Sequence, residues 1–316
     1  MCCAASARCV FLQFNQQCDW ASKPTACYEE SVDYRVIGAQ AVSKVGGLAC
    51  LIRSVASFSI NSPHTGASQP AAVPAAALTV EDVAMLARMQ ARGQHISLTL
   101  KMSAVLTTTT AVGHNVVAEI TGSELPHEVV LVSGHLDSWD VGQGAMDDGG
   151  GMAISWMALA ALRSLGLRPR RTLRLVLWSC EEFGGVGAQQ YFDAHQKEAS
   201  NMSIVMESDM GVFAAQGLQL TASPAATAIV TQIGQLLRRI NATAVTPGGD
   251  GTDIAPWMSA GVPGASLLNH NERYFWFHHS DGDTMSVLNS DDVDRCAAVW
   301  AVHAYTIANL AAMLPR

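Results

Sequence analysis

The sequence predicts an α/β protein with a mixed, largely parallel sheet flanked by helices. Three short apolar runs at residues 129–132, 173–178 and 203–206 are typical of strands that are buried on both faces of a sheet. Polar loops and helical patterns alternate with these runs, and that alternation favours a parallel sheet. Because ligands of open α/β sheets bind beyond the carboxyl ends of the strands, chemistry is expected at those ends.

The composition narrows the class of protein. A chain of 316 residues corresponds to about two domains, and its 49% apolar residues supply a core. The formal net charge of -8 opposes binding to a nucleic-acid backbone. No apolar stretch has the length of a membrane-spanning helix, and Arg8 interrupts what would otherwise resemble a signal sequence. The cysteines form no paired C-x₂-C elements, so neither a zinc ribbon nor a disulfide framework is indicated.

The first part of the chain predicts a small α/β domain over residues 31–112, after an unassigned stretch at residues 1–30. Residues 38–55 begin as a helix rich in small residues and continue into a strand at 49–53. Residues 62–77 are rich in Pro, Ala and Ser, which favours a loop. Thr79 is a suitable N-cap for a helix over residues 80–92. A further strand is expected at residues 96–102.

The second part predicts a larger domain over residues 113–316. Its expected elements, in chain order, are strands at 116–121, 129–132, 173–178, 203–206 and 262–268, and helices at 152–165, 224–240, 254–260 and 291–313. This order places polar loops after several of the strands.

Histidines and carboxylates gather at four places in the larger domain. They are His135, Asp137 and Asp147; Glu181 and Glu182; Asp209; and His278, His279 and Asp283. Two histidines with three or four carboxylates exceed the ligands of one tetrahedral metal ion, but they suit two zinc-like ions that share a carboxylate and a water. The sequence has no H-E-x-x-H and no G-x-S-x-G motif, which disfavours a mononuclear zinc peptidase and a serine hydrolase.

Each pair of acidic residues also has a simpler interpretation. Asp147 and Asp148 beside glycines fit a turn with a helix N-cap. Glu181 and Glu182 fit the solvated first turn of a helix. The glycines around them do not form a G-x-G-x-x-G dinucleotide motif, because Asp147 occupies the position of the third glycine. The metal-site interpretation therefore depends on the pairs occurring together.

Five segments resemble the co-catalytic di-zinc peptidases, a family that includes bacterial secreted aminopeptidases. The segments are SGHLDSWDVGQGAMDDGGG, RTLRLVLWSCEEFGGVGA, MESDMG, GDGTDIAPWMSAGVPGASLL and FHHSDGDTM. Residues 34–65 and 78–102 also resemble a protease-associated domain inserted in such an enzyme, so residues 31–112 would be a partial domain of that type. The resemblance covers most of residues 34–315, and it implies a three-layer sandwich fold for the larger domain.

Position by position, the resemblance implies a site for two zinc ions. The ligands would be His135 and Asp209 on one ion, Glu182 and His279 on the other, and Asp147 between the two. Glu181 would be the general base. Asp137 would hold the second ring nitrogen of His135. Glu207 competes with Asp209, because both would face the same side of the strand if it ran on that far.

The resemblance further implies a metallo-exopeptidase that hydrolyses dipeptides or short unblocked peptides. Such an enzyme would be secreted or lysosomal and homodimeric, with no nucleic-acid partner and no membrane insertion. The N-x-S/T sequons at Asn201 and Asn241 permit glycosylation in that pathway. Two alternatives stay open: a catalytically silent relative that serves as a binding or receptor-type ectodomain, and an amidohydrolase that acts on non-peptide amides.

Relatives in this family begin with a signal peptide, a propeptide and sheet-forming segments. Residues 1–30 do not resemble those segments. We therefore expect the sheet to lack one or more strands and to expose apolar surface where they would pack.

Overall fold

The computed structural model describes residues 9–12, 18–20, 22–58, 60–105 and 107–316. These residues form two compact units. The smaller unit contains the described residues up to Val112 together with Glu272–Gly282, and the larger contains Gly113–Asn271 and Asp283–Arg316. The segment at 272–282 therefore packs with the start of the chain, although its neighbours in sequence belong to the larger unit.

The smaller unit contains a parallel three-stranded sheet in the order β1-β2-β3. Its elements are β1 (Cys9–Leu12), α1 (Pro24–Val36), α2 (Gly38–Lys44), β2 (Ala49–Arg53), β3 (Ala75–Leu78), α3 (Val80–Ala91) and α8 (Tyr274–Phe277). The Thr79 side chain caps α3 by accepting the N–H of Asp82 at 3.0 Å, as predicted. A disulfide joins Cys18, which precedes α1, to Cys27 in the first turn of that helix.

Two sequence predictions in this unit are wrong. The segment at 62–77 was expected to be a loop, but its last residues belong to β3, which pairs in parallel with β2. The strand expected at 96–102 is irregular, and Leu98, Leu100 and Met102 are exposed there. Its alternating pattern fits a strand, but a strand also needs a neighbour to receive its hydrogen bonds, and no described strand pairs with it.

The larger unit is built on a mixed seven-stranded sheet in the order β4-β6-β5-β7-β10-β8-β9, which confirms the predicted fold class. The strands are β4 (Val116–Ile120), β5 (Leu125–His135), β6 (Arg171–Trp178), β7 (Met202–Glu207), β8 (Ala215–Thr221), β9 (Ala244–Pro247) and β10 (Gly264–Asn269). The pairs β4–β6 and β10–β8 are antiparallel, and the other pairs are parallel.

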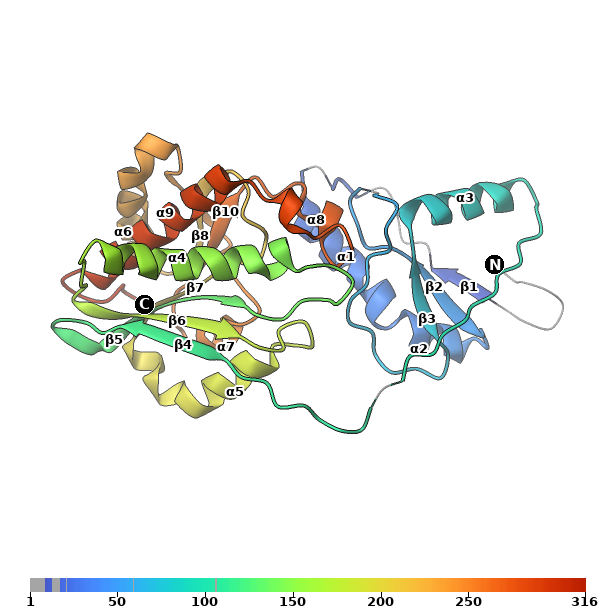
Figure 1. Cartoon of the computed structure of the whole chain (residues 1–316), viewed down its shortest axis with the longest axis horizontal. Coiled ribbons are helices and arrows are strands. Elements are labelled where there is room, and N and C mark those ends of the chain that lie inside the picture. Colours follow the sequence, from blue (N-terminus) through green and yellow to red (C-terminus); the bar gives the residue numbers. More distant parts are fainter. Residues whose placement is uncertain (1–8, 13–17, 21, 59, 106) are drawn as a thin grey trace. The chain divides into compact units, whose positions relative to one another are not determined.

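Helices cover both faces of this sheet (Figure 1). On one face lie α4 (Gly150–Ser164), α6 (Pro224–Gly234) and α9 (Ser290–Ala308), and on the other lie α5 (Val186–His195) and α7 (Ala255–Ser259). The apolar run in β5 serves both layers, because Val130 and Val132 pack towards α4 while Val129 and Leu131 pack towards α7. Burial on both faces explains why the run is uniformly apolar.

Some elements of the larger unit differ from the prediction. The helix expected at 224–240 is α-helical only to Gly234 and continues as a 3₁₀ turn to Ile240. The helix expected at 291–313 ends at Ala308. Sequence patterns missed α5, β8 and β9. The pattern of β8 is weak because it contains Gly217, a residue type that is uncommon inside strands. Glycine is required at this position, since a Cβ there would lie 1.9 Å from the carbonyl oxygen of Ala244 in β9.

Strand β4 forms one edge of the sheet. Val116 and Val117 on this strand are 48% and 46% exposed. The expectation that the sheet lacks one or more strands stays a prediction. Among the described residues no helix is both long and apolar enough to cross a membrane.

His303 gives the larger unit a pH-dependent stability. It is fully buried in α9, its Nδ1 donates to the carbonyl oxygen of Val299 at 2.9 Å, and burial lowers its pKa to about 4. Because the folded pKa lies below the ordinary value near 6.5, stability is complete above pH 6.5 and is lost as the pH falls towards 4. When the pH is lowered from 7.5 to 5, we expect protonation of His303 to lower the free energy of unfolding by about 2 kcal/mol.

Replacing the ring by an apolar side chain tests this origin. His303→Leu should show a shallower loss of stability between pH 7.5 and pH 5 than the wild type, because no buried imidazole then takes up a proton. Denaturant unfolding of both proteins at the two pH values measures the difference. Equal slopes would assign the pH dependence to other groups.

Candidate metal centre

His135 ends strand β5, and its ring is fully buried. Its Nδ1 lies 2.9 Å from the main-chain carbonyl oxygen of Asp137, which can only accept, so Nδ1 is the donor. Its Nε2 faces carboxylates, with oxygens of Asp209 at 3.2 Å, Asp147 at 3.3 Å and Glu181 at 3.9 Å. Such an arrangement of acceptors around a ring nitrogen requires a positive charge, which is either a proton on the ring or a cation among the ligands.

The two aspartates before α4 have different surroundings. Asp148 accepts the main-chain N–H groups of His135 and Gly151, each at 3.0 Å, and so joins the end of β5 to the start of α4. Asp147 donates its own N–H to the carboxylate of Asp283 at 3.2 Å, and one of its own carboxylate oxygens lies 3.3 Å from Nε2 of His135. The simpler interpretation as a helix start therefore fits Asp148, and the role of Asp147 as a metal ligand stays a prediction.

The turn after β6 carries Glu181 and Glu182. The N–H of Glu181 donates to one carboxylate oxygen of Asp137 at 3.0 Å, and the N–H of Glu182 donates to the other at 3.2 Å. The Asp137 carboxylate was expected to hold the His135 ring, but it lies 3.9 Å from Nδ1, and the main-chain carbonyl of Asp137 makes that contact. The side chain is used instead to join the loop after β5 to the turn after β6.

Removing the Asp137 carboxylate should disturb the turn more than the metal ligands. We expect Asp137→Ala to lower kcat by about 10- to 100-fold, because Glu181 loses the acceptor that fixes its backbone. Asp137→Asn, which keeps one carbonyl oxygen, should lie between this variant and the wild type. Metal content measured on the same samples should change little, and a complete loss of metal would contradict this role.

Beyond β7, Asp209 rather than Glu207 lies beside His135. Glu207 is fully buried and accepts the N–H groups of Asp253 and Ile254, at 3.1 Å and 3.0 Å, at the start of α7. Asp253 is also fully buried, and the pKa of its carboxyl is affected by the charges of both His135 and Asp209. Sequence reasoning missed this residue as part of the cluster. Its signal was the position of Asp253 inside the GDGTDI segment, one residue before an apolar helix.

The buried carboxyls are expensive to ionise together. Burial, reinforced by the charge of Asp209, raises the pKa of Glu181 to about 8. Burial likewise raises the pKa of Asp209 to about 6 and that of Asp253 to about 8. For His135, burial alone would lower the pKa, but Asp209 and Asp147 shift it upward overall. The cluster thus holds more carboxyls than can ionise together unaided, and a divalent cation would favour their ionised forms.

Two sets of side chains in the larger unit have donor atoms within 4.8 Å of one another, close enough to hold a metal ion. The sets are His135, Asp147 and Glu182, and His135, Asp148 and Asp209. One imidazole nitrogen with several carboxylate oxygens, and no thiolate, is a donor set that zinc accepts. The residues therefore fit a divalent metal such as zinc.

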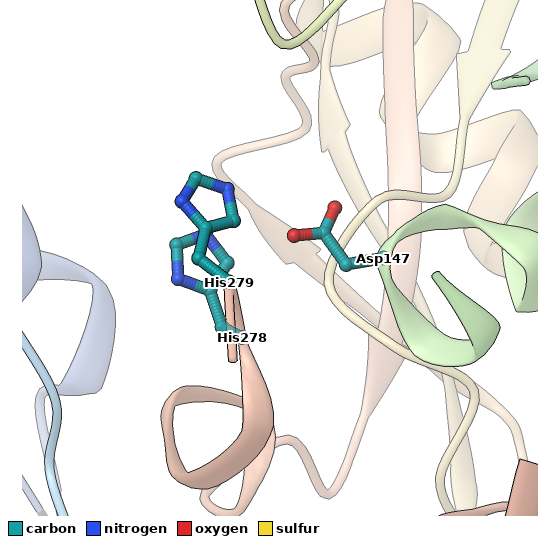
Figure 2. A group of neighbouring side chains, drawn as sticks. All are labelled: Asp147, His278 and His279. Atoms are coloured by element: carbon teal, nitrogen blue, oxygen red, sulfur yellow. The ribbon is translucent and has the colours of Figure 1, made fainter. Parts of the chain in front are cut away.

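The seven residues predicted from the sequence divide between the two units. Six of them lie in the larger unit and form one cluster: His135, Asp137, Asp147, Glu181, Glu182 and Asp209. His279 belongs to the smaller unit, where it follows α8. Its ring lies parallel to that of His278, with centroids 3.5 Å apart and an interplanar angle of 17° (Figure 2).

Comparison with known proteins identifies the family. The model of peptidase family M28 matches residues 115–304. Carboxypeptidase Q from Xenopus laevis is 54% identical over 93% of this chain, and the human protein of that name is 53% identical over 99%. The chain spans 64% and 66% of the lengths of these two relatives.

Solved structures agree with this relationship. A peptidase M28 precursor from Shewanella amazonensis matches with a TM-score of 0.84 and 31% identity, over 92% of this chain and 66% of that one. The fold alone is shared with a zinc aminopeptidase from Bacillus subtilis, at a TM-score of 0.63 and 18% identity over 89% of this chain and 67% of that one. The resemblance read from the motifs is confirmed, and the chain belongs to peptidase family M28.

Proposed function

We propose that this chain is a zinc-dependent exopeptidase that hydrolyses dipeptides or short unblocked peptides. The observation that carries the proposal is the position of Glu181, whose carboxylate lies 3.9 Å from Nε2 of His135 within a cluster of metal-binding side chains. A carboxylate beside a metal's ligands is placed to accept a proton from the metal's water. The names of the relatives support the same activity.

The proposed site holds two zinc ions. We assign His135 and Asp209 to the first ion, Glu182 and His279 to the second, and Asp147 to both. The distances of Asp147 and Asp209 from His135 support the first part of this assignment. The assignment of His279 follows from the FHHSDGDTM motif.

When bound, zinc would lower the pKa of a coordinated water and would polarise a carbonyl oxygen. Glu181 takes a proton from the attacking water and delivers it to the amine that leaves when the peptide bond breaks. Asp137 fixes the backbone of Glu181 while this proton is transferred. Asp148 and Asp283 hold the main chain at His135 and Asp147.

We further propose that the protein works in the secretory pathway or the lysosome, as a homodimer. Glycosylation at Asn201 or Asn241 would show that the protein passes through the secretory pathway.

Metal analysis combined with hydrolysis of one dipeptide tests the function. The purified full chain should contain zinc and should hydrolyse the dipeptide with free termini faster than versions blocked at either end. Folded protein without zinc and without turnover would favour the silent binding protein. Equal rates on blocked dipeptides or simple amides would favour an amidohydrolase.

A further inference from the structure

His279 has a backbone conformation that its residue type rarely adopts. Its φ is +58°, in the left-handed region that favours glycine. Such a conformation persists in a non-glycine residue only where surrounding contacts hold it. Contacts within the smaller unit hold His279 in this conformation.

The loop at residues 63–67 supplies those contacts. The N–H of Thr65 donates to the carbonyl oxygen of His279 at 2.8 Å, and the ring Nδ1 of His279 lies 3.1 Å from the carbonyl oxygen of Thr65. In the same way Nδ1 of the buried His64 lies 2.5 Å from the carbonyl oxygen of His278. The loop thus holds two successive residues, 278 and 279, through main-chain atoms.

The contact with Thr65 also selects the tautomer of the His279 ring. A carbonyl oxygen can only accept a hydrogen bond, so Nδ1 of His279 must carry the proton. The lone pair of the neutral ring then lies on Nε2, which is the nitrogen that would bind a metal ion. Metal-binding histidines in proteins are oriented in this way, by a hydrogen bond at the other ring nitrogen.

Arg35 in α1 fastens the loop in turn. The guanidinium is buried and donates from Nη1 to the carbonyl oxygen of Thr65 at 3.0 Å, from Nε to that of Ala67 at 3.4 Å, and from Nη2 to the hydroxyl of Tyr28 at 2.8 Å. The Thr65 carbonyl therefore accepts from both Arg35 and His279, which its two lone pairs allow.

Gly66 makes room for this arrangement. A Cβ at Gly66 would lie 2.3 Å from Cζ of Arg35, so any side chain there would push the guanidinium away from the loop. A substitution of either Arg35 or Gly66 should therefore remove the same contact, that between the guanidinium and the Thr65 carbonyl.

We propose that Arg35 and Gly66 are positioning residues for a metal ligand: through the Thr65 carbonyl they set the tautomer and orientation of His279. This inference rests on the proposed function in one respect, the assignment of His279 to zinc. The tautomer itself is independent of that assignment.

Nitrogen-15 NMR of the histidine rings tests the tautomer in the metal-free full chain, with His279→Asn used to assign the signals. In the wild type His279 should show a protonated Nδ1 and an unprotonated Nε2. Gly66→Ala and Arg35→Met should shift both signals towards a mixture of tautomers. A wild-type ring protonated at Nε2, or signals that neither variant moves, would overturn the proposal.

Zinc titration of the same proteins tests the consequence. Gly66→Ala and Arg35→Met should weaken binding of the second zinc by about 10- to 100-fold and leave the first unchanged. Arg35→Lys, which keeps the charge and part of the hydrogen bonding, should recover part of the loss. Gly93→Ala is the matched control, because Gly93 in the same unit has φ +70° but nothing within 4 Å of its Cβ position.

The outcomes separate the two proposals. If the wild type binds two zinc ions and both variants bind them equally well, the positioning role fails and the proposed function stands. If the wild type binds no zinc, the proposed function fails, and the NMR result alone decides whether the loop sets the tautomer. If Gly66→Ala does not fold while Gly93→Ala does, the Arg35 variants carry the decision.

Discussion

Glu181→Gln is expected to bind zinc as the wild type does and to hydrolyse a dipeptide about 10²- to 10⁴-fold more slowly. The amide of Gln keeps the size and polarity of the side chain, but it cannot accept the proton of the attacking water. Because Glu181 is assigned no metal, the metal content should not change. Steady-state kinetics and metal analysis on one preparation measure both effects.

The control for this variant is Glu124→Gln. Glu124 is an exposed carboxylate of the same unit that pairs with Arg170 at 2.8 Å, so its loss changes the net charge equally without touching the cluster. It should retain full activity. Wild-type turnover in Glu181→Gln would remove Glu181 as the base, and loss of zinc from that variant would make it a ligand instead.

Asp147→Ala should lose metal as well as activity. Asp147 is assigned to both ions, so its removal takes one ligand from each and leaves the remaining carboxylates without a shared cation. We expect the bound zinc to fall from two ions to one or fewer and the activity to fall by more than about 10³-fold. Metal analysis after dialysis against a low zinc concentration measures the stoichiometry.

Zinc should also stop stabilising this variant. A ligand that binds only the folded state raises unfolding free energy by about 4 kcal/mol at a concentration 1,000 times its dissociation constant. Zinc should therefore stabilise the wild type by this amount and should have little effect on Asp147→Ala. Asp140→Ala is the control, because Asp140 is an exposed aspartate of the same loop, and zinc should stabilise it as it does the wild type. Full zinc stabilisation of Asp147→Ala would show that Asp147 is not a ligand.

The fold and the ligands were predictable to different degrees, for physical reasons. Uniformly apolar runs such as that in β5 are buried on both faces, so their composition alone predicts central strands. Strand β8 was missed because Gly217 and alternating polar residues weaken its pattern, and its pairing with β10 lies far along the chain. Likewise, the strand expected at 96–102 has the local pattern but no described partner.

Most residues of the cluster could be predicted because they follow the ends of strands, and the carboxyl ends of parallel strands meet at one edge of the sheet. Sequence alone did not reveal which acceptor each group meets. The Asp137 carboxylate contacts the backbone of Glu181 and Glu182 instead of the His135 ring, and Asp253 belongs to a segment before which the sequence patterns predicted no strand. These are contacts between segments distant in sequence, and they depend on how the loops close.

The contact made by Asp137 has a consequence for how metal enters and leaves the protein. Its carboxylate joins the loops that carry His135 and Glu182 by two hydrogen bonds to main-chain N–H groups, and neither bond involves a metal. Emptying the centre therefore leaves these loops tied to each other. Unlike small zinc domains, whose folding depends on the ion, the proposed centre would be able to exchange its metal while the unit stays folded. The proposed activity would then follow the zinc supply without a cycle of unfolding and refolding.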